Sequence, residues 1–210
     1  MAVWLKQLGR TKKKGKGMTV DKEKFFREIM QVDDSALART LAGMSDVLYL
    51  EKGELFIHQG DRQEDFLFLV NGVFRGFYLD MNGKEITDCF GVNPGTPAMS
   101  ASISNTISPI SIEAATECVL VRVPGRDLLP LIESNTLLLK IYNEILQTAI
   151  QIHWELKFVV SQRTALERYQ WFLEKYPGLI DRISNKHIAT LLGMSPVTFS
   201  RIRTMLREQE

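Results

Sequence analysis

The chain has 210 residues and a net charge of +1, with 45% hydrophobic and 24% charged residues, enough to bury one substantial core or two smaller ones. It contains no run of about 18 apolar residues that could cross a bilayer and no apolar signal segment at its start, so we expect a cytoplasmic protein without membrane contact. The two cysteines form no CxxC pair and the three histidines have no ligand spacing, so we assign no disulfide framework, no metal and no cofactor.

The charges are distributed unevenly along the chain. Residues 1–17 carry six basic residues and no acidic one, residues 18–156 carry 11 basic and 20 acidic residues, and residues 157–210 carry nine basic and five acidic residues. We interpret residues 1–17 either as a disordered basic extension or as the product of a start codon upstream of Met18. An acidic body followed by a basic end is typical of a sensor domain joined to a module that binds anions.

The segment 18–127 is predicted to form a β-roll preceded by helices. Between residues 18 and 44, apolar residues recur at helical spacing, and Gly43 lies near the end of this pattern. Residues 47–123 then alternate short runs of Val, Leu, Ile and Phe with the turn sequences KGE, QGD, VNG and MNG, at the spacing expected of an all-β barrel or sandwich. The predicted fold class is α+β, with a small, jelly-roll-like β-roll as the first domain.

Residues 128–160 are predicted to form a long dimerisation helix. Apolar residues recur there every seven positions, with a second apolar set three residues before them, which makes an a/d seam over about three heptads. A helix packed against the β-roll of its own chain would show a similar pattern, so that alternative remains open. The seam consists of Leu138, Tyr142, Ile145, Ala149, Ile152, Leu156 and Val159.

Residues 161–210 are predicted to form a helix-turn-helix domain. In the sequence ISNKHIATLLGMSPVTFSRIRTML, Gly193 favours the positive φ of a helix C-terminus and Pro196 suits the first position of a new helix, so one helix ends and another begins. Ser184 and Ser195 are the predicted N-caps of the two helices. Apolar residues of the second helix face the core at spacings of three and four, which leaves a polar face outward.

A short helix with a polar outward face, aimed by a tight turn, fits the recognition helix of a DNA-binding domain. Arg201 can pair bidentately with guanine, whereas Ser195 and Thr198 suit backbone phosphate, and Arg203 on the flank is a further phosphate candidate. A helical hairpin that merely packs is the alternative. The candidate DNA-contacting residues are Ser195, Pro196, Val197, Thr198, Ser200, Arg201, Arg203 and Thr204.

Residues 25–206 resemble the Crp/Fnr family of bacterial transcription regulators. The resemblance is carried by KGELFIHQGDRQEDFLFLVNGVFRGFY, with its turn glycines Gly53, Gly60 and Gly72, and by HIATLLGMSPVTFSRIRTML. It implies a cyclic-nucleotide-binding-type β-roll, a long dimer helix and a helix-turn-helix that binds a pseudo-palindromic site on double-stranded DNA as a homodimer. It also implies RNA polymerase and a small-molecule effector as further partners.

In the family, the first two turns of the recognition helix read the bases, which maps onto Pro196, Val197, Ser200 and Arg201. Pro196 and Val197 offer no side-chain hydrogen bond. The resemblance therefore implies that base readout rests on Ser200 and Arg201.

The chain departs from the members of the family that bind cyclic AMP. Those carry Gly-Glu-Leu and, about ten residues later, Arg-Ser or Arg-Thr, whose Glu and Arg hold the ribose and the cyclic phosphate by charge-assisted bonds. Here no Arg or Lys occurs between Lys84 and Arg122, so we expect no cyclic nucleotide binding. A pocket for a different ligand and a solvated loop are both open. The candidate effector-pocket residues are Ala98 near the Glu position, Met99, Ser100, and Ser108 and Pro109 at the Arg-Ser position.

Other sensor chemistries of the family are also not indicated. Two cysteines cannot supply the four ligands of an iron-sulfur cluster, no histidine signals haem, and only REQE follows Leu206, so no wing is apparent after the recognition helix. No nucleophile with a base, metal cluster or phosphate loop is visible, which argues against an enzyme. The alternative function is a small-molecule sensor or protein-interaction module that does not bind DNA.

Overall fold

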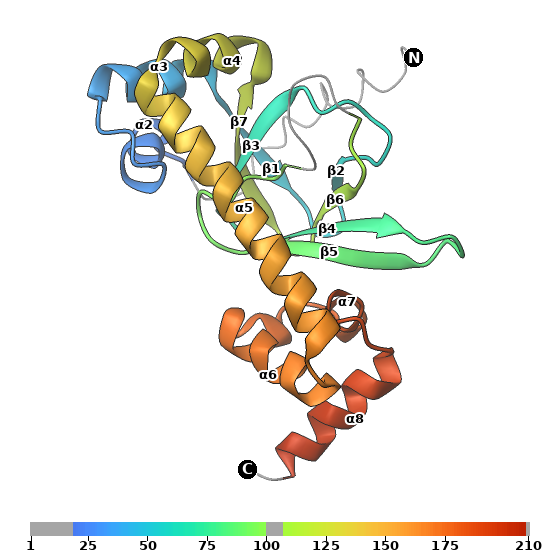
Figure 1. Cartoon of the computed structure of the whole chain (residues 1–210). Helices are drawn as coiled ribbons and strands as arrows, with labels where there is room; N and C mark the ends of the chain where they lie inside the picture. Colours follow the sequence, from blue (N-terminus) through green and yellow to red (C-terminus); the bar gives the residue numbers. More distant parts are fainter. Residues whose placement is uncertain (1–18, 100–106, 209–210) are drawn as a thin grey trace.

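The structure is a computed structural model that describes residues 19–99 and 107–208. A β-structure with helices at one side forms one end of the molecule, a long helix runs away from it, and three helices form the other end (Figure 1). The predicted basic extension, residues 1–17, lies outside the described residues.

The first helices begin where acidic residues cap them. The Asp21 carboxylate accepts a hydrogen bond from the Lys24 amide, and the Asp34 carboxylate accepts from two amides of the next helix, as expected of N-cap residues. A π-helical turn lies between the two helices and buries Phe25 and Phe26. The elements are α2 (Lys22–Lys24), η1 (Phe25–Ile29) and α3 (Ser35–Met44).

Two antiparallel sheets form the β-roll and confirm its prediction. One sheet has the strand order β1-β7-β3 and the other β2-β6-β4-β5, and Leu69, Ile112 and Leu120 are fully buried in the same apolar cluster. The strands in the described residues are β1 (Asp46–Leu50), β2 (Leu55–Ile57), β3 (Asp65–Asn71), β4 (Phe74–Leu79), β5 (Glu85–Gly91), β6 (Ser111–Ala114) and β7 (Cys118–Pro124).

The predicted helix 128–160 is divided in two. Helix α4 (Gly125–Ser134) ends at Asn135, whose extended backbone separates it from helix α5 (Thr136–Gln162). The Asn135 side chain accepts a hydrogen bond from the Leu138 amide at 3.1 Å and so caps the new helix. Asparagine favours a capping position over a helix interior, so the helix is interrupted at Asn135. The period of apolar residues continues across this interruption.

The C-terminal helices share one core. Thr164 and Glu167 form a reciprocal capping box at the start of α6, and Phe172, Ile188 and Phe199 from three helices are fully buried together. The elements are α6 (Ala165–Lys175), η2 (Leu179–Asp181), α7 (Asn185–Leu191) and α8 (Pro196–Arg207). No strand follows α8 among the residues described up to 208, and no helix described is long and apolar enough to cross a membrane.

Gly72 and Gly53 allow a matched test of the turns in the β-roll. Both have a positive φ, +104° and +86°, but a Cβ on Gly72 would overlap the Glu117 carbonyl oxygen, whereas a Cβ on Gly53 would meet nothing within 4 Å. Alanine at either position should cost about 1–3 kcal/mol of backbone strain. Gly72→Ala should cost about 1–3 kcal/mol more because of the overlap. Urea unfolding of both variants measures the difference, and equal midpoints would contradict this account of the turn.

Candidate nucleic-acid interface

The end of one helix and the start of the next are fixed by caps and by Gly193. The Ser184 hydroxyl accepts a hydrogen bond from the Lys186 amide at 3.3 Å, and α7 ends before Gly193, which has a φ of +62°. The Ser195 hydroxyl accepts from the Thr198 amide at 3.0 Å, and Pro196 is the first residue of α8. The predicted stop and restart of the helix is confirmed.

The turn between α7 and α8 is braced from two other helices. The Arg168 guanidinium, on α6, donates to the Leu192 carbonyl at 2.8 Å and to the Gly193 carbonyl at 3.3 Å. A Cβ at Gly193 would lie 3.0 Å from the Val160 side chain on α5, so a larger residue in the turn would require Val160 to shift by a few tenths of an ångström. This role of Arg168 could not be identified from the sequence, because the carbonyls that it contacts lie 24 and 25 residues away.

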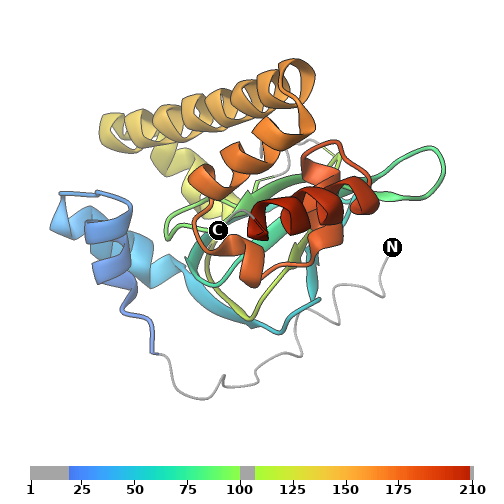
Figure 2. The same cartoon turned by 90° about the horizontal axis from the view of Figure 1, so that it is seen from below.

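Helix α8 has one buried and one exposed face. Phe199 and Ile202 are buried, and the Phe199 ring contacts that of Tyr169 on α6 at 5.3 Å between centroids. The helix lies at the end of the molecule away from the β-roll in Figure 1, and seen from below it lies in front of the β-roll (Figure 2). The exposed positions include most of the predicted DNA-contacting residues: Ser195, Pro196, Val197, Thr198, Ser200, Arg201 and Thr204.

Arg203 does not share this exposed face. Its guanidinium donates to the Asn185 side chain at 3.0 Å and lies 3.6 Å from the Asp181 carboxylate, and the side chain is only 21% exposed. These contacts hold α8 against the start of α7 and against η2. Its donors are therefore directed into its own domain, and contact between Arg203 and phosphate stays a prediction.

The predicted dimer seam on α5 is largely covered by the chain itself. Leu138, Tyr142 and Ile145 contact the apolar cluster formed with the N-terminal helices, while Leu156 and Val159 contact the cluster of the C-terminal helices. Burial within the same chain is therefore sufficient to explain the heptad pattern at its two ends, and the dimer seam stays a prediction. Between these ends, the predicted seam residue Ile152 is exposed and Ala149 is half-buried.

A different face of α5 is apolar and uncovered. Leu139, Ile150, Trp154 and Phe158 are 43%, 57%, 50% and 52% exposed. Their spacings of eleven, four and four residues place them on one side of a helix. The rings of Trp154 and Phe158 stack with centroids 5.8 Å apart. We call these four residues the α5 apolar stripe.

The predicted effector-pocket residues do not line an open pocket together. Ala98 is fully buried, and its amide and carbonyl are hydrogen-bonded to the Leu67 carbonyl and the Gln63 side chain. Ser108 is buried and donates its hydroxyl to the Ile110 carbonyl at 2.5 Å. The polar groups of these two residues therefore stabilise the local fold. An alignment with ligand-binding relatives does not show such contacts within the chain. Pro109 is exposed, and Ser100 lies outside the described residues.

Met99 instead lines a small apolar cavity. The cavity has a volume of about 40 Å³ and lies between η1, α3, β3, α4 and the start of α5, with Phe26, Phe66 and Tyr142 among its walls. A space of this size holds no more than a few atoms and offers almost no polar surface. Among the residues described, no group of three His, Cys, Asp or Glu side chains is placed to hold a metal ion.

Comparisons with known proteins agree with this architecture. Residues 47–135 match the cyclic nucleotide-binding domain family. A search of curated proteins by sequence returns no match.

Solved structures resemble most of the chain. FixK2 from Bradyrhizobium japonicum is 18% identical, with a TM-score of 0.70 over 79% of this chain and 85% of that chain. CLP, a c-di-GMP-responsive global regulator of Xanthomonas campestris, is 14% identical, with a TM-score of 0.68 over 84% and 93%. A protein from Eubacterium rectale assigned to the Crp/Fnr family of transcriptional regulators is 17% identical, with a TM-score of 0.66 over 84% of each chain.

Cyclic AMP and cyclic GMP should not bind. The chain has no Arg or Lys between Lys84 and Arg122, and the serine at the expected arginine position, Ser108, is buried and directed to a backbone carbonyl. A cyclic phosphate without a charge-assisted partner loses its main anchor. Isothermal titration with both nucleotides is expected to give no heat of binding. Micromolar affinity for either would contradict this assignment.

Proposed function

The chain has the fold of the Crp/Fnr regulators, with a cyclic-nucleotide-binding-type domain at residues 47–135, and from this premise we propose that it is a cytoplasmic transcription regulator that binds DNA as a homodimer. The main observation in support is that α8 exposes one face to solvent, while Arg168 holds the sharp turn that joins α7 to α8. A recognition helix must be both rigidly aimed and uncovered.

Charge and side-chain type on α8 favour DNA as the partner. Residues 157–210 carry nine basic and five acidic residues, although the chain as a whole is nearly neutral. Arg201 is exposed, and its planar guanidinium matches the O6 and N7 atoms of guanine in the major groove. Ser200 lies beside it on the exposed face, and Ser195 and Thr198 at the helix start are placed for backbone phosphate.

Dimerisation through the α5 apolar stripe would pair two recognition helices. Helix α5 has 27 residues and is therefore about 40 Å long; three stripe residues lie in its second half, between Ile150 and Phe158, and Leu139 lies near its start. Several large apolar side chains left half-exposed on one helix face favour an interface over solvent. A second copy of the chain offers the same stripe, so a two-fold axis along α5 would bury both.

Regulation is a separate part of the proposal. The missing Arg and Glu of the phosphate cassette point to an effector other than a cyclic mononucleotide, or to no effector. The c-di-GMP response belongs to CLP and is one chemistry to test on this chain. Contact with RNA polymerase is a further expectation for a regulator of this fold. A sensor or interaction module that does not bind DNA is the competing function, and the DNA experiment below separates the two.

Replacing stripe residues should disrupt the dimer. Ile150→Asp with Trp154→Asp places two charges in an apolar interface, so we expect monomers. Thr148→Asp is the control, because Thr148 is exposed on α5 outside the stripe. Sedimentation equilibrium gives the mass, and circular dichroism checks that the variants fold. A double variant that stays dimeric, with Ala149→Asp and Ile152→Asp giving monomers instead, would return the interface to the heptad seam.

Two arginines on the same helix should behave differently. Arg201→Ala should cost about 1–3 kcal/mol on the best site and remove preference at one base position in each half-site. Arg203→Ala should lower the free energy of unfolding but leave sequence preference unchanged, because its guanidinium contacts Asn185 and Asp181.

The experiment is selection from a random DNA library, followed by titration of the wild type and both variants. A regulator of this type should enrich a pseudo-palindrome with half-sites about 34–36 Å apart. If no palindrome is enriched, the non-DNA-binding sensor becomes the better account.

A further inference from the structure

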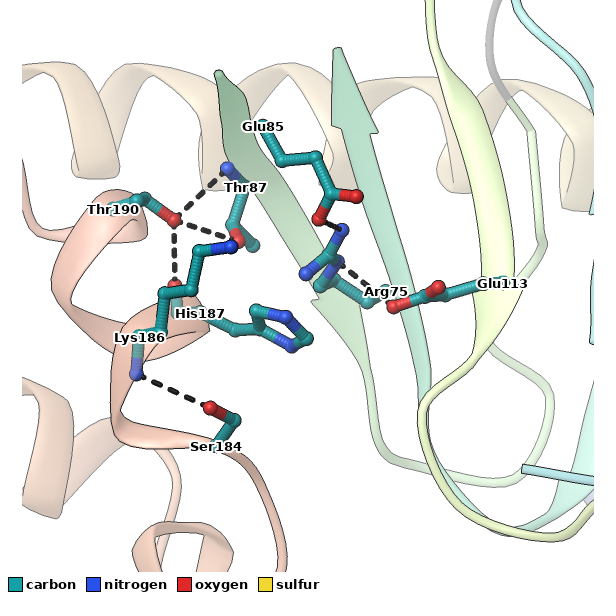
Figure 3. A network of polar contacts seen from close by, with 8 residues as sticks. All are labelled: Arg75, Glu85, Thr87, Glu113, Ser184, Lys186, His187 and Thr190. Carbon is teal, nitrogen blue, oxygen red and sulfur yellow. Dashed lines mark hydrogen bonds and ion pairs between the residues drawn. The ribbon is translucent and has the colours of Figure 1, made fainter. Parts of the chain in front are cut away.

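The first helix of the helix-turn-helix is hydrogen-bonded to the β-roll. The hydroxyl of Thr190 on α7 lies 2.9 Å from the hydroxyl of Thr87 on β5, and it accepts a hydrogen bond from the Thr87 amide at 3.2 Å (Figure 3). Both threonines are buried. The two residues are 103 positions apart in the sequence, so this contact joins the two domains.

A buried arginine lies beside this pair. The side chain of Arg75 on β4 is fully buried, 2.6 Å from the Glu85 carboxylate and 3.1 Å from that of Glu113, and it lies over the Phe77 ring. Its Nη1 has no hydrogen-bond partner among the described residues. The hydrogen bond from Arg75 lowers the pKa of Glu85, whereas burial raises the pKa of Glu113 against the opposing charge of Arg75.

His187 on α7 is directed toward Arg75 (Figure 3). Burial, then the charge of Arg75 and to a smaller extent those of Lys186 and Lys52 together lower the pKa of His187 to about 4, and the charge of Glu85 opposes them. The imidazole is therefore neutral at neutral pH, and the interface holds one buried cation with two carboxylates. A cation at position 187 would be repelled by Arg75, Lys186 and Lys52, and Arg75 outweighs the attraction of Glu85 there.

Aromatic residues complete the contact. The Phe90 ring of β5 meets those of Phe172 and Tyr176, with centroids 6.5 Å and 6.3 Å apart. Apolar contacts of this kind are not directional and allow sliding. The Thr87–Thr190 hydrogen bonds are directional, so they fix where α7 lies along β5.

Movement of α7 would carry α8 with it. Arg168 braces the turn between the two helices, and Arg203 of α8 is hydrogen-bonded to Asn185 of α7. The orientation of the recognition helix relative to the β-roll therefore depends on how α7 sits on β5.

We propose that Thr87 and Thr190 are positioning residues for DNA recognition. They lie next to Arg75, Glu85, Glu113 and His187, which we call the Arg75 cluster, and they fix the orientation of each helix-turn-helix on its β-roll. That orientation sets the half-site spacing that the dimer accepts. This inference rests on the proposed function. Neither residue touches DNA; both act through α7 and α8.

Thr190→Val keeps the shape of the side chain and removes the hydroxyl. The variant loses both hydrogen bonds between the Thr190 hydroxyl and Thr87, and also the bond from that hydroxyl to the His187 carbonyl in its own helix. Its preference for the best half-site spacing over spacings longer or shorter by one base pair should fall by at least about fivefold to tenfold, the effect expected of a single buried hydrogen bond. Its affinity for a single half-site should be unchanged. Thr190→Ser keeps the hydroxyl and should restore the preference. A Thr190→Val protein with the wild-type spacing preference would overturn the proposal.

Hydrogen exchange tests the contact without DNA. The Thr87 amide donates to Thr190, so its exchange should be about fivefold to tenfold faster in Thr190→Val and near the wild-type rate in Thr190→Ser. Unchanged exchange in Thr190→Val would also overturn the proposal. If the wild type selects no DNA site, the proposed function and the role in spacing both fail, while faster exchange at Thr87 would still establish the contact as a separate result.

His187→Lys gives a second, independent variant. It places a second cation beside the buried Arg75, and the same loss of spacing preference is expected with the single half-site affinity retained. His187→Gln, which stays neutral, is its matched control. Equal behaviour of the Lys and Gln variants would count against a role for the Arg75 cluster.

Discussion

The burial of both ends of α5 in two different cores is the constraint on which the rest of the molecule depends. Leu138 lies in the cluster with the N-terminal helices, and Val159 lies in the cluster with the C-terminal helices. The helix therefore links the β-roll to the helix-turn-helix as one rigid element, and only its middle and one face remain available for a partner. The second link, from β5 to α7, means that the helix-turn-helix is held from two sides.

Local chemistry made the helix-turn-helix predictable from sequence. Ser184, Gly193, Ser195 and Pro196 each act within a few residues of their own position, and the structure shows all four in the expected roles. The β-roll was predictable for the same reason, since its turn glycines and short apolar strands are local features. Asn135 shows the limit: a single capping residue divides a helix whose apolar period continues across it.

Features that depend on distant partners were not predictable. The heptad pattern of α5 indicates which side chains are buried, but it does not indicate whether the side chains that cover them come from the same chain or from another. From the sequence, Arg203 was expected to be a cation on the surface of α8, because its contacts with Asn185 and Asp181 form only in the folded domain. Ala98 and Ser108 aligned with ligand-binding positions, yet their polar groups are used by the fold itself. The contact between Thr87 and Thr190 could not be predicted from the sequence because it forms only when the two domains dock, and the ion pairs of Arg75 depend on the pairing of three strands.

Protection of guanine N7 from methylation tests most directly whether α8 contacts base edges in the major groove. With a duplex carrying a selected site, we expect the wild type to protect one guanine in each half-site, the two separated by about one helical turn. Arg201→Ala should leave both guanines reactive at a protein concentration that still occupies the site. Unprotected guanines under the wild type, or the same protection under Arg201→Ala, would contradict the account.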